Sequence, residues 1–237
     1  MCGRFSLTLA WSDLAALYRI GSRSTPRNLA SRYNIAPTQN VTVVRHASDT
    51  GERELAELRW GLVPPWARDL TVGARMINAR AETVAEKPAF RQALARRRCL
   101  IPADGFYEWR KRSRGPKQPY RIAMKDGSPF AFAGLWESWD RSADGKPVES
   151  CTIITTAANE LVRTIHDRMP VILAGSDHDA WLDAVGHPAG TVLDMLAPFP
   201  ASEMTAVPVS TYVNSAAHDD ARCFEPADRS NGDLFAT

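Results

Sequence analysis

The order of short apolar segments along the chain limits most strongly which folds it can adopt. Extended segments are predicted at residues 41–45, 58–63, 75–82, 105–110, 119–124, 130–136, 150–155, 171–173 and 204–210. Helical segments are predicted at residues 13–19, 88–97, 158–163, 179–185 and 192–196. Residues 32–38 are predicted to form a turn. Because strands and helices do not alternate as in a βαβ fold, we predict an α+β fold with a mainly antiparallel, barrel-like sheet and flanking helices.

The length of 237 residues fits one large domain or two small ones, and 44% hydrophobic residues are enough for a packed core. We expect a single domain at residues 2–225, followed by a polar tail at residues 226–237. The strand at residues 105–110 illustrates the expected packing. Alternation places Phe106, Glu108 and Arg110 on one face, with Tyr107 and Trp109 on the other.

The cysteines are spaced like those of a reduced intracellular protein. Cys2, Cys99, Cys151 and Cys223 form no CxxC pair, so neither a zinc site nor a disulfide framework is predicted. The sequence shows no long apolar stretch for a membrane span and no apolar core of a signal peptide. We expect a cytoplasmic protein that has no membrane contact.

Positive charge is concentrated in one part of the chain, although the net charge is only +2. Eight Arg or Lys residues lie between Arg91 and Arg121, opposed only by Asp104 and Glu108. These eight are Arg96, Arg97, Arg98, Arg110, Lys111, Arg112, Arg114 and Lys117. Guanidinium groups bind phosphates and stack on bases, so this run suits a nucleic-acid groove. A solvated protein surface is the other explanation.

The chain begins with Met1-Cys2-Gly3-Arg4. The initiator methionine is normally removed before a small residue, so we expect a mature N-terminus at Cys2 with an α-amine and a thiol on one residue. An α-amine has a pKa near ~8, so a useful fraction is unprotonated at neutral pH. Cys2 could act as a nucleophile with its amine as base, or amine and thiol could together capture an aldehyde. It could also be only a small apolar residue.

Three further positions carry side chains that could join Cys2 in catalysis. They are Asn78 with Arg80, Glu108, and His166. Each has an ordinary structural explanation when taken alone: a turn residue, a strand-surface carboxylate and a structural histidine. No HExxH or GxSxG motif is present, which weakens metalloenzyme and serine-hydrolase interpretations. No metal or cofactor is predicted.

Six motifs in fixed order carry a resemblance that the single positions do not. They are Met1-Cys2-Gly3-Arg4-Phe5, Tyr33-Asn34-Ile35-Ala36-Pro37, Trp60-Gly61-Leu62, Ile77-Asn78-Ala79-Arg80-Ala81-Glu82, Gly105-Phe106-Tyr107-Glu108-Trp109 and His166-Asp167-Arg168-Met169-Pro170. Together they resemble the SOS response-associated peptidase family, from the first residue to about Pro208. Six ordered motifs are far more specific than one.

The resemblance implies that residues 2–225 form a catalytic and DNA-binding domain with a groove for single-stranded DNA. It also implies covalent capture of abasic sites as a thiazolidine crosslink, and association with the nucleoid when the protein is bound to DNA. Cys2 would be the nucleophile, Asn78 would orient it, and Glu108 and His166 would move protons. The expected DNA-contacting residues are Arg4, Asn34, Trp66, Arg80, Trp109 and Arg168, the arginines on phosphates and the tryptophans in stacking or wedge positions. After Val213-Asn214 the sequence departs from the family pattern, so Asn214 is only a weak candidate.

The abasic sugar is mostly a closed hemiacetal, and an acid such as His166 would help to open it. An imine at the sugar also favours β-elimination, so an AP-lyase side activity is expected. The expected partner is single-stranded DNA with abasic sites, including replication-fork DNA, and we expect a monomer. Two alternatives stay open: a cysteine-type peptidase that uses Cys2 and removes Met1, and a non-catalytic single-strand binder.

Overall fold

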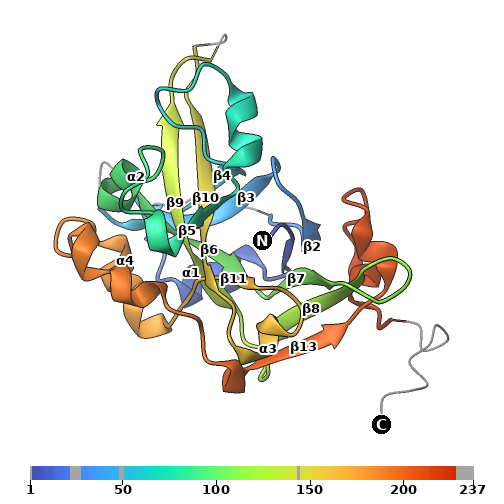
Figure 1. The fold of residues 1–237 in the computed structure, drawn as a ribbon. Coiled ribbons are helices and arrows are strands. Elements are labelled where there is room, and N and C mark those ends of the chain that lie inside the picture. The colour runs from blue at the N-terminus through green and yellow to red at the C-terminus, as the bar shows by residue number, and fades with distance from the viewer. Residues whose placement is uncertain (1, 22–27, 48–50, 143–144, 228–237) are drawn as a thin grey trace.

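The computed structural model describes residues 2–21, 28–47, 51–142 and 145–227. Its centre is a closed barrel of five strands (Figure 1). These are β3 (Asn40–His46), β4 (Arg53–Trp60), β6 (Arg98–Ala103), β9 (Phe130–Trp139) and β10 (Val148–Ala157). Neighbours run antiparallel except β4 and β10, which pair in parallel where the barrel closes. The predicted α+β fold with a mainly antiparallel, barrel-like sheet is confirmed.

Apolar side chains fill the barrel, and strands β6 and β9 approach each other closely. Val43, Leu58 and Phe132 are completely buried. At Gly134 on β9, an added Cβ would lie 2.8 Å from the Sγ atom of Cys99. A side chain there would require the neighbouring strand to move, so glycine allows β6 and β9 to pack this closely.

A second sheet of five strands packs beside the barrel, in the order β13-β8-β7-β1-β2. Its strands are β1 (Phe5–Leu7), β2 (Arg32–Ile35), β7 (Gly105–Arg110), β8 (Gln118–Met124) and β13 (Met204–Pro208). Phe5 joins the two sheets, because its ring lies edge-on to Trp60 and Phe132 with centroids 5.2 and 5.7 Å away. The turn predicted for residues 32–38 was wrong at its start: residues 32–35 pair with β1 as a strand.

Three short strands complete the main sheet. They are β5 (Asn78–Arg80), β11 (Arg168–Pro170) and β12 (Ile172–Leu173). Both β5 and β11 pair with β10, and β12 pairs with β9. The extended segment predicted at residues 75–82 is a strand only at 78–80, because short 3-10 helices precede and follow it.

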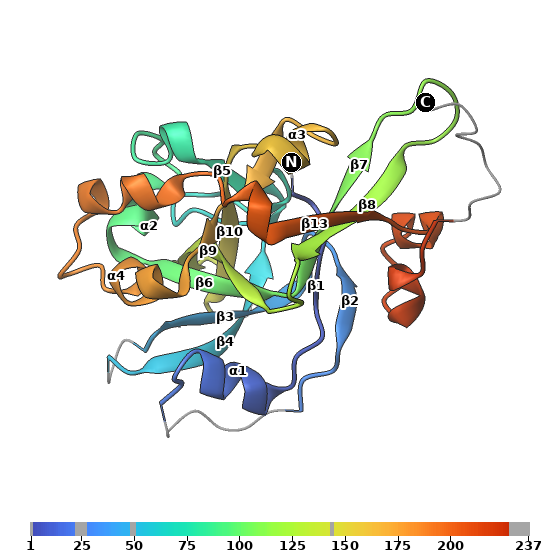
Figure 2. The same cartoon turned by 90° about the horizontal axis from the view of Figure 1, so that it is seen from below.

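The helices are short and lie around the sheets (Figures 1 and 2). They are α1 (Trp11–Leu17), α2 (Arg91–Arg96), α3 (Glu160–Arg163) and α4 (His178–Leu182). The 3-10 helices are η1 (Leu70–Arg75), η2 (Ala81–Thr83), η3 (Gly175–Asp177), η4 (Ala189–Thr191), η5 (Leu193–Leu196), η6 (Ala201–Glu203), η7 (Thr211–Asn214) and η8 (Ala221–Phe224). The predicted helix at 88–97 begins three residues late, at Arg91. None of the described helices is both long and apolar enough to cross a bilayer.

The last described residues, 209–227, fold back against β2 and β7 and are named the C-terminal segment (red in Figure 1). The carboxylate of Asp219 accepts hydrogen bonds from the backbone N–H groups of Tyr33 and Asn34, at 2.5 and 2.8 Å, and pairs with Arg32. These hydrogen bonds and this ion pair therefore hold the C-terminal segment against β2. Its apolar side meets Tyr107 and forms a small separate core with Val209, Val213 and Cys223.

We predict that Asp219→Ala lowers the free energy of unfolding by about 2–3 kcal/mol, because hydrogen bonds to a charged acceptor are worth more than neutral ones. Urea unfolding measures the change. The substitution should also expose the buried Cys223 thiol to a thiol-reactive probe. The control is Asp140→Ala, which removes an exposed carboxylate and should shift stability by less than about 0.5 kcal/mol. Equal stability of the two variants would contradict the role assigned to Asp219.

Candidate active site

The pairing of β1 with β7 places the start of the chain beside Glu108. The two strands are antiparallel, with Phe5 opposite Phe106. Residues that precede Phe5 therefore lie beside residues that follow Phe106. This register brings Cys2 and Glu108 together, although 105 intervening residues separate them in the sequence.

Cys2 is completely buried and belongs to the main hydrophobic core. Its carbonyl oxygen accepts a hydrogen bond from Nδ2 of Asn78 at 2.9 Å. Burial, and then the negative charge of Glu108, raise the pKa of the Cys2 thiol. The thiol is therefore neutral at neutral pH. Met1, whose removal the sequence predicts, lies outside the described residues.

Glu108 is a buried carboxyl on β7, with 3% of its surface exposed. Burial raises its pKa, and the positive charge of a protonated His166 acts in the opposite direction. The two side chains are therefore close enough to influence each other's charge. A carboxyl whose pKa is raised toward neutrality can both take up and release a proton.

His166 follows α3 and is held in one orientation by the backbone. The N–H of Arg168 donates to Nδ1 of the imidazole at 3.0 Å. Because Nδ1 accepts this bond, the neutral ring carries its proton on Nε2. The Asp167 carboxylate lies 2.9 Å from the same Nδ1 and can pair with the ring once Nδ1 is protonated. The arrangement leaves Nε2–H as the donor.

Only the nitrogen of the Asn78 side-chain amide forms a hydrogen bond within the described structure. Its nitrogen donates to the Cys2 carbonyl, whereas its oxygen is buried and has no hydrogen-bond partner among the described residues. A buried amide oxygen without a partner costs free energy. It therefore offers an acceptor beside Cys2.

Arg4 is fixed next to Cys2 mainly by the C-terminal segment. Its guanidinium donates to the carbonyl oxygens of Val213 at 2.8 Å and Asn214 at 3.2 Å, and lies 5.8 Å from the Trp109 ring centroid. The Trp109 indole N–H donates in turn to the side-chain oxygen of Asn214 at 2.8 Å. Asn214 therefore holds both predicted DNA-contacting side chains, a role that the sequence did not reveal beyond the matching Val-Asn pair.

Asn34 lies beneath this group and is completely buried. Its side-chain oxygen accepts from Arg4 at 2.8 Å. Its side-chain nitrogen donates to the carbonyl oxygens of Val213, Ser215 and His218, at 3.1, 2.9 and 2.7 Å. The structure therefore places Asn34, predicted as a DNA contact, as an internal support of Arg4.

Arg80 and Arg168 meet at the end of β10. Arg80 lies opposite Thr155, and the Arg168 guanidinium donates to the Thr155 carbonyl oxygen at 2.7 Å. Arg168 also forms a two-pronged ion pair with Glu82, one contact measuring 2.9 Å. Arg80 is exposed. The ion pair of Glu82 with Arg168 was not predicted from the sequence. The only signal for it was that Glu82 belongs to the same motif as Asn78 and Arg80.

Trp66 is the remaining residue that was predicted to contact DNA. It sits on the turn after β4 with 55% of its surface exposed. Among the described residues no hydrogen bond or ring contact joins it to the group around Cys2. The structure thus brings together Cys2, Asn78, Glu108, His166, Arg4, Trp109, Arg80 and Arg168. Trp66 stays a predicted DNA contact with an exposed side chain.

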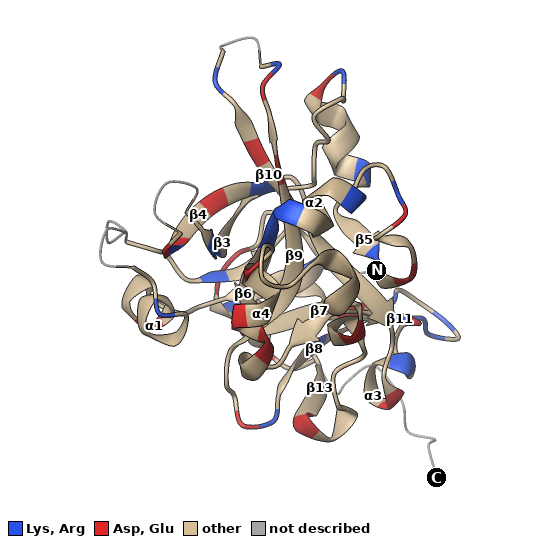
Figure 3. Ribbon diagram, turned by 90° about the vertical axis from the view of Figure 1, so that its left-hand side faces the viewer, with Lys and Arg blue, Asp and Glu red and all other residues tan. Residues whose placement is uncertain are grey.

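The basic run predicted as one groove is divided by the fold. Arg98 is buried and donates to the carbonyl oxygens of Asp183 and His187 at 2.8 and 2.7 Å. Arg121 donates to the carbonyl oxygen of Asp104 at 2.9 Å. The exposed remainder lies in two places, on α2 and on the loop between β7 and β8, which stand on opposite sides of the molecule (Figures 1 and 2). Figure 3 shows the basic positions of α2.

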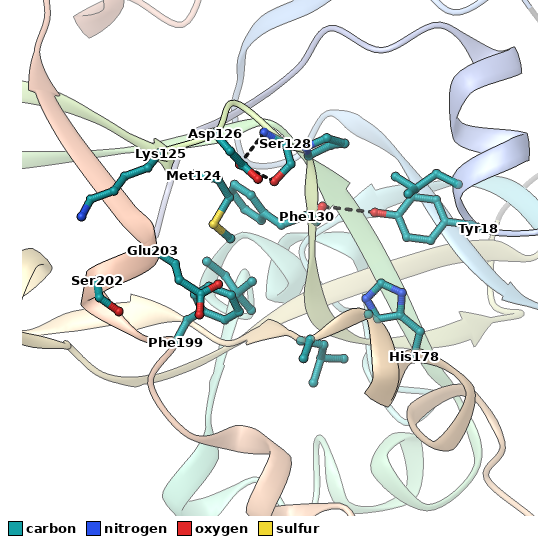
Figure 4. Close-up of a pocket in the computed structure, with 16 residues that line it drawn as sticks. Tyr18, Met124, Lys125, Asp126, Ser128, Phe130, His178, Phe199, Ser202 and Glu203 are labelled. Atoms are coloured by element: carbon teal, nitrogen blue, oxygen red, sulfur yellow. Dashed lines mark hydrogen bonds between the residues drawn. The ribbon is translucent and has the colours of Figure 1, made fainter.

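Two sizeable pockets lie on different sides of the barrel. The first, of about 460 Å³, lies beside His166 and is lined by Trp109, Arg110, Lys111, Lys117, Thr164, Ile165, His166 and Asp167. The second, of about 400 Å³, lies between α4 and the turn after β8 and includes Tyr18, Phe130 and His178 (Figure 4). Only the first is continuous with the group around Cys2. No cluster of His, Cys, Asp or Glu among the described residues could hold a metal.

The site combines a nucleophile, a proton donor, a buried carboxyl and several cations. The thiol and N-terminal region of Cys2 can bond to an electrophile, and His166 and Glu108 can exchange protons with it. The exposed Arg80 and the lysines of the adjacent pocket can attract an anion. Such a set suits an electrophilic group carried by a polyanion.

Comparisons with known proteins agree with this chemistry. Abasic site processing protein YoaM from Bacillus subtilis (strain 168) is 44% identical over 225 residues, which cover 95% of this chain and 98% of that protein. Abasic site processing protein HMCES from Gallus gallus is 33% identical over 264 residues, covering 95% and 78%. A crystal structure of a protein from Bacteroides thetaiotaomicron superimposes with a TM-score of 0.84 at 28% identity, covering 95% of this chain and all of that one.

The family match is equally extensive. Residues 1–216 match the family described as SOS response associated peptidase (SRAP). Since this match and the similar proteins each span most of the chain, the protein belongs to the SOS response associated peptidase (SRAP) family.

Proposed function

We propose that this protein captures abasic sites in single-stranded DNA by forming a thiazolidine crosslink with Cys2. The observation that carries the proposal is the convergence of Cys2, Glu108 and His166, which come from three distant parts of the chain. The names of the similar proteins support the substrate. The crosslink would shield the lesion until the strand is repaired.

The reaction would proceed in three steps: ring opening, imine formation and ring closure by the thiol. Proton transfer opens the cyclic hemiacetal of the abasic sugar to an aldehyde and a hydroxyl group. The unprotonated α-amine of Cys2 then attacks the aldehyde carbon, and loss of one water gives an imine. Finally the thiol adds across the C=N bond, sulfur to carbon and hydrogen to nitrogen, which closes a five-membered ring. The net change is the loss of one water molecule.

The surrounding side chains suit these steps. Nε2–H of His166 can donate to the ring oxygen as the hemiacetal opens. The Glu108 carboxyl, with its raised pKa, can accept a proton from the amine and return one later. The Asn78 side-chain oxygen can accept a hydrogen bond from the α-amine of the mature chain. An imine also acidifies the neighbouring sugar carbon, so strand cleavage by β-elimination is a proposed side reaction.

The rival function is a cysteine-type peptidase, which the family name suggests and which would include removal of Met1. A peptidase of this kind attacks with a thiolate, and reactive cysteines have lowered pKa values. Here burial and Glu108 raise the pKa of the Cys2 thiol. This favours chemistry that begins with the amine and uses the neutral thiol second.

The first test uses a denaturing gel with a single-stranded oligonucleotide that contains one abasic site. Wild type should give a heat-resistant shifted band, and Cys2→Ala should give none. Cys2→Ser keeps the amine and loses the thiol, so its adduct should appear only after reduction with borohydride. A chain with an uncleaved N-terminal extension keeps the thiol but has no free amine at Cys2. An undiminished crosslink in that chain would refute the proposed mechanism.

For His166 we predict a defect in ring opening alone. His166→Ala should slow capture roughly 100-fold or more, the range of general acid catalysis. Affinity for an oligonucleotide with a tetrahydrofuran analogue, which has no aldehyde, should stay near that of wild type. An oligonucleotide carrying an open-chain aldehyde should restore most of the rate.

His187→Ala serves as the control, because it removes a half-exposed histidine that pairs with Asp183. Equal slowing of His166→Ala on the closed and the open-chain substrate would exclude a role in ring opening.

The pH dependence of capture tests Glu108. The carboxylate is the active base, and its pKa is raised, so the active form disappears as the pH falls through a value above the usual ~4.3. The amine also loses activity on protonation. Below the Glu108 pKa, log rate should therefore fall with a slope of about 2 in wild type and about 1 in Glu108→Gln. Single-turnover rates measure this, and an unchanged slope in Glu108→Gln would contradict a base role.

A further inference from the structure

The loop between β7 and β8 is the most strongly basic exposed part of the described chain near the active site. Its residues 111–117 are all exposed, and they include Lys111, Arg112, Arg114 and Lys117. No acidic residue occurs between Glu108 and Asp126. Figure 2 shows β7 and β8 extending beyond the sheets as a hairpin. We name residues 110–118 the basic hairpin.

The base of the basic hairpin forms one wall of the 460 Å³ pocket beside His166. Arg110, Lys111 and Lys117 line the pocket together with His166. Arg110 is steadied by stacking over the Tyr120 ring, with its guanidinium carbon 4.8 Å from the centroid. The pocket is within the ~300–1,000 Å³ range of small-ligand sites, large enough for a nucleotide.

We propose that the basic hairpin binds the DNA strand on one side of the lesion, with a neighbouring nucleotide in this pocket and its phosphates on Lys111 and Lys117. The inference rests on the proposed function for the position of the lesion. It adds a binding site for undamaged nucleotides, and it gives the strand a direction, because the hairpin would hold only one side of the lesion.

The composition of the pocket favours a nucleotide over a protein partner. Single-strand binding sites combine cations that follow the phosphates with an aromatic ring for a base. Trp109 supplies the ring, and the Arg4 guanidinium lies over it. A nucleotide here would sit directly beside the reacting sugar, because His166 lines the same pocket.

The second exposed basic group, on α2, provides an internal comparison. Arg91 and Arg96 are exposed, but α2 lies on the other side of the molecule from the hairpin (Figures 1 and 2). Both groups contribute equally to net charge. Only a group placed along the path of the strand should affect binding strongly.

The experiment compares Lys111→Gln/Lys117→Gln with Arg91→Gln/Arg96→Gln, which removes the same charge. Affinity for single-stranded oligonucleotides with one tetrahydrofuran site is measured at several salt concentrations. Each lost phosphate contact reduces the slope of log affinity against log salt by about 0.7 for single strands. The hairpin variant should lose about 1.4 in slope and bind roughly 10- to 30-fold more weakly at 0.1 M salt. The α2 variant should match wild type.

Strand direction is tested by placing the tetrahydrofuran site near the 5′ end or near the 3′ end of otherwise equal oligonucleotides. The hairpin defect should appear with only one of the two placements. An equal defect with both, or no difference between the hairpin and α2 variants, would overturn the inference. Absence of a crosslink in wild type would instead refute the proposed function, since the tetrahydrofuran measurements involve no covalent step.

Discussion

The antiparallel pairing of β1 with β7 is the contact on which the candidate active site depends. β1 has only three residues, yet it lies between β2 and β7 and places Phe5 against both Trp60 and Phe132 of the barrel. This packing fixes the position of the residues before Phe5 along β7. An N-terminus is ordinarily among the least ordered parts of a protein. Here it enters the core, and Cys2 meets Glu108 as a result.

Burial determines the protonation states of Cys2 and Glu108. A carboxyl and a thiol removed from water both favour their neutral forms, and the charge of Glu108 further raises the pKa of the Cys2 thiol. His166 partly offsets this when protonated. At neutral pH the thiol therefore stays protonated, while the raised pKa of the Glu108 carboxyl lets this group exchange a proton more readily than an exposed carboxyl would. That property suits a sequence of ring opening, imine formation and thiol addition.

The fold also separates arginines that look alike in the sequence. Arg98 and Arg121 are occupied by backbone carbonyl oxygens, and Arg4 is bound by the C-terminal segment through Val213 and Asn214. These guanidinium groups act mainly as internal cross-links. Lys111, Lys117 and Arg80 are exposed instead. Charge counting alone therefore overestimates the binding surface.

Local patterns were enough to predict several features of this protein. Alternation in residues 105–110 correctly separated Phe106, in the main core, from Tyr107 and Trp109, which contact the C-terminal segment. The absence of a βαβ order predicted the α+β class. The motifs also contain Cys2, Asn78, Glu108 and His166, which the fold brings near one another. Such features depend on neighbours two residues apart or on residue identity.

Only the tertiary structure decided which segments pair. It made residues 32–35 a strand, closed the barrel through the parallel contact of β4 with β10, and buried Asn34 under Arg4. It also divided the basic run between α2 and the hairpin. These outcomes depend on packing between residues far apart in the chain, where the gain from burial must exceed the entropy of closing long loops. The residue pattern of a single segment cannot predict the difference between these two free-energy contributions.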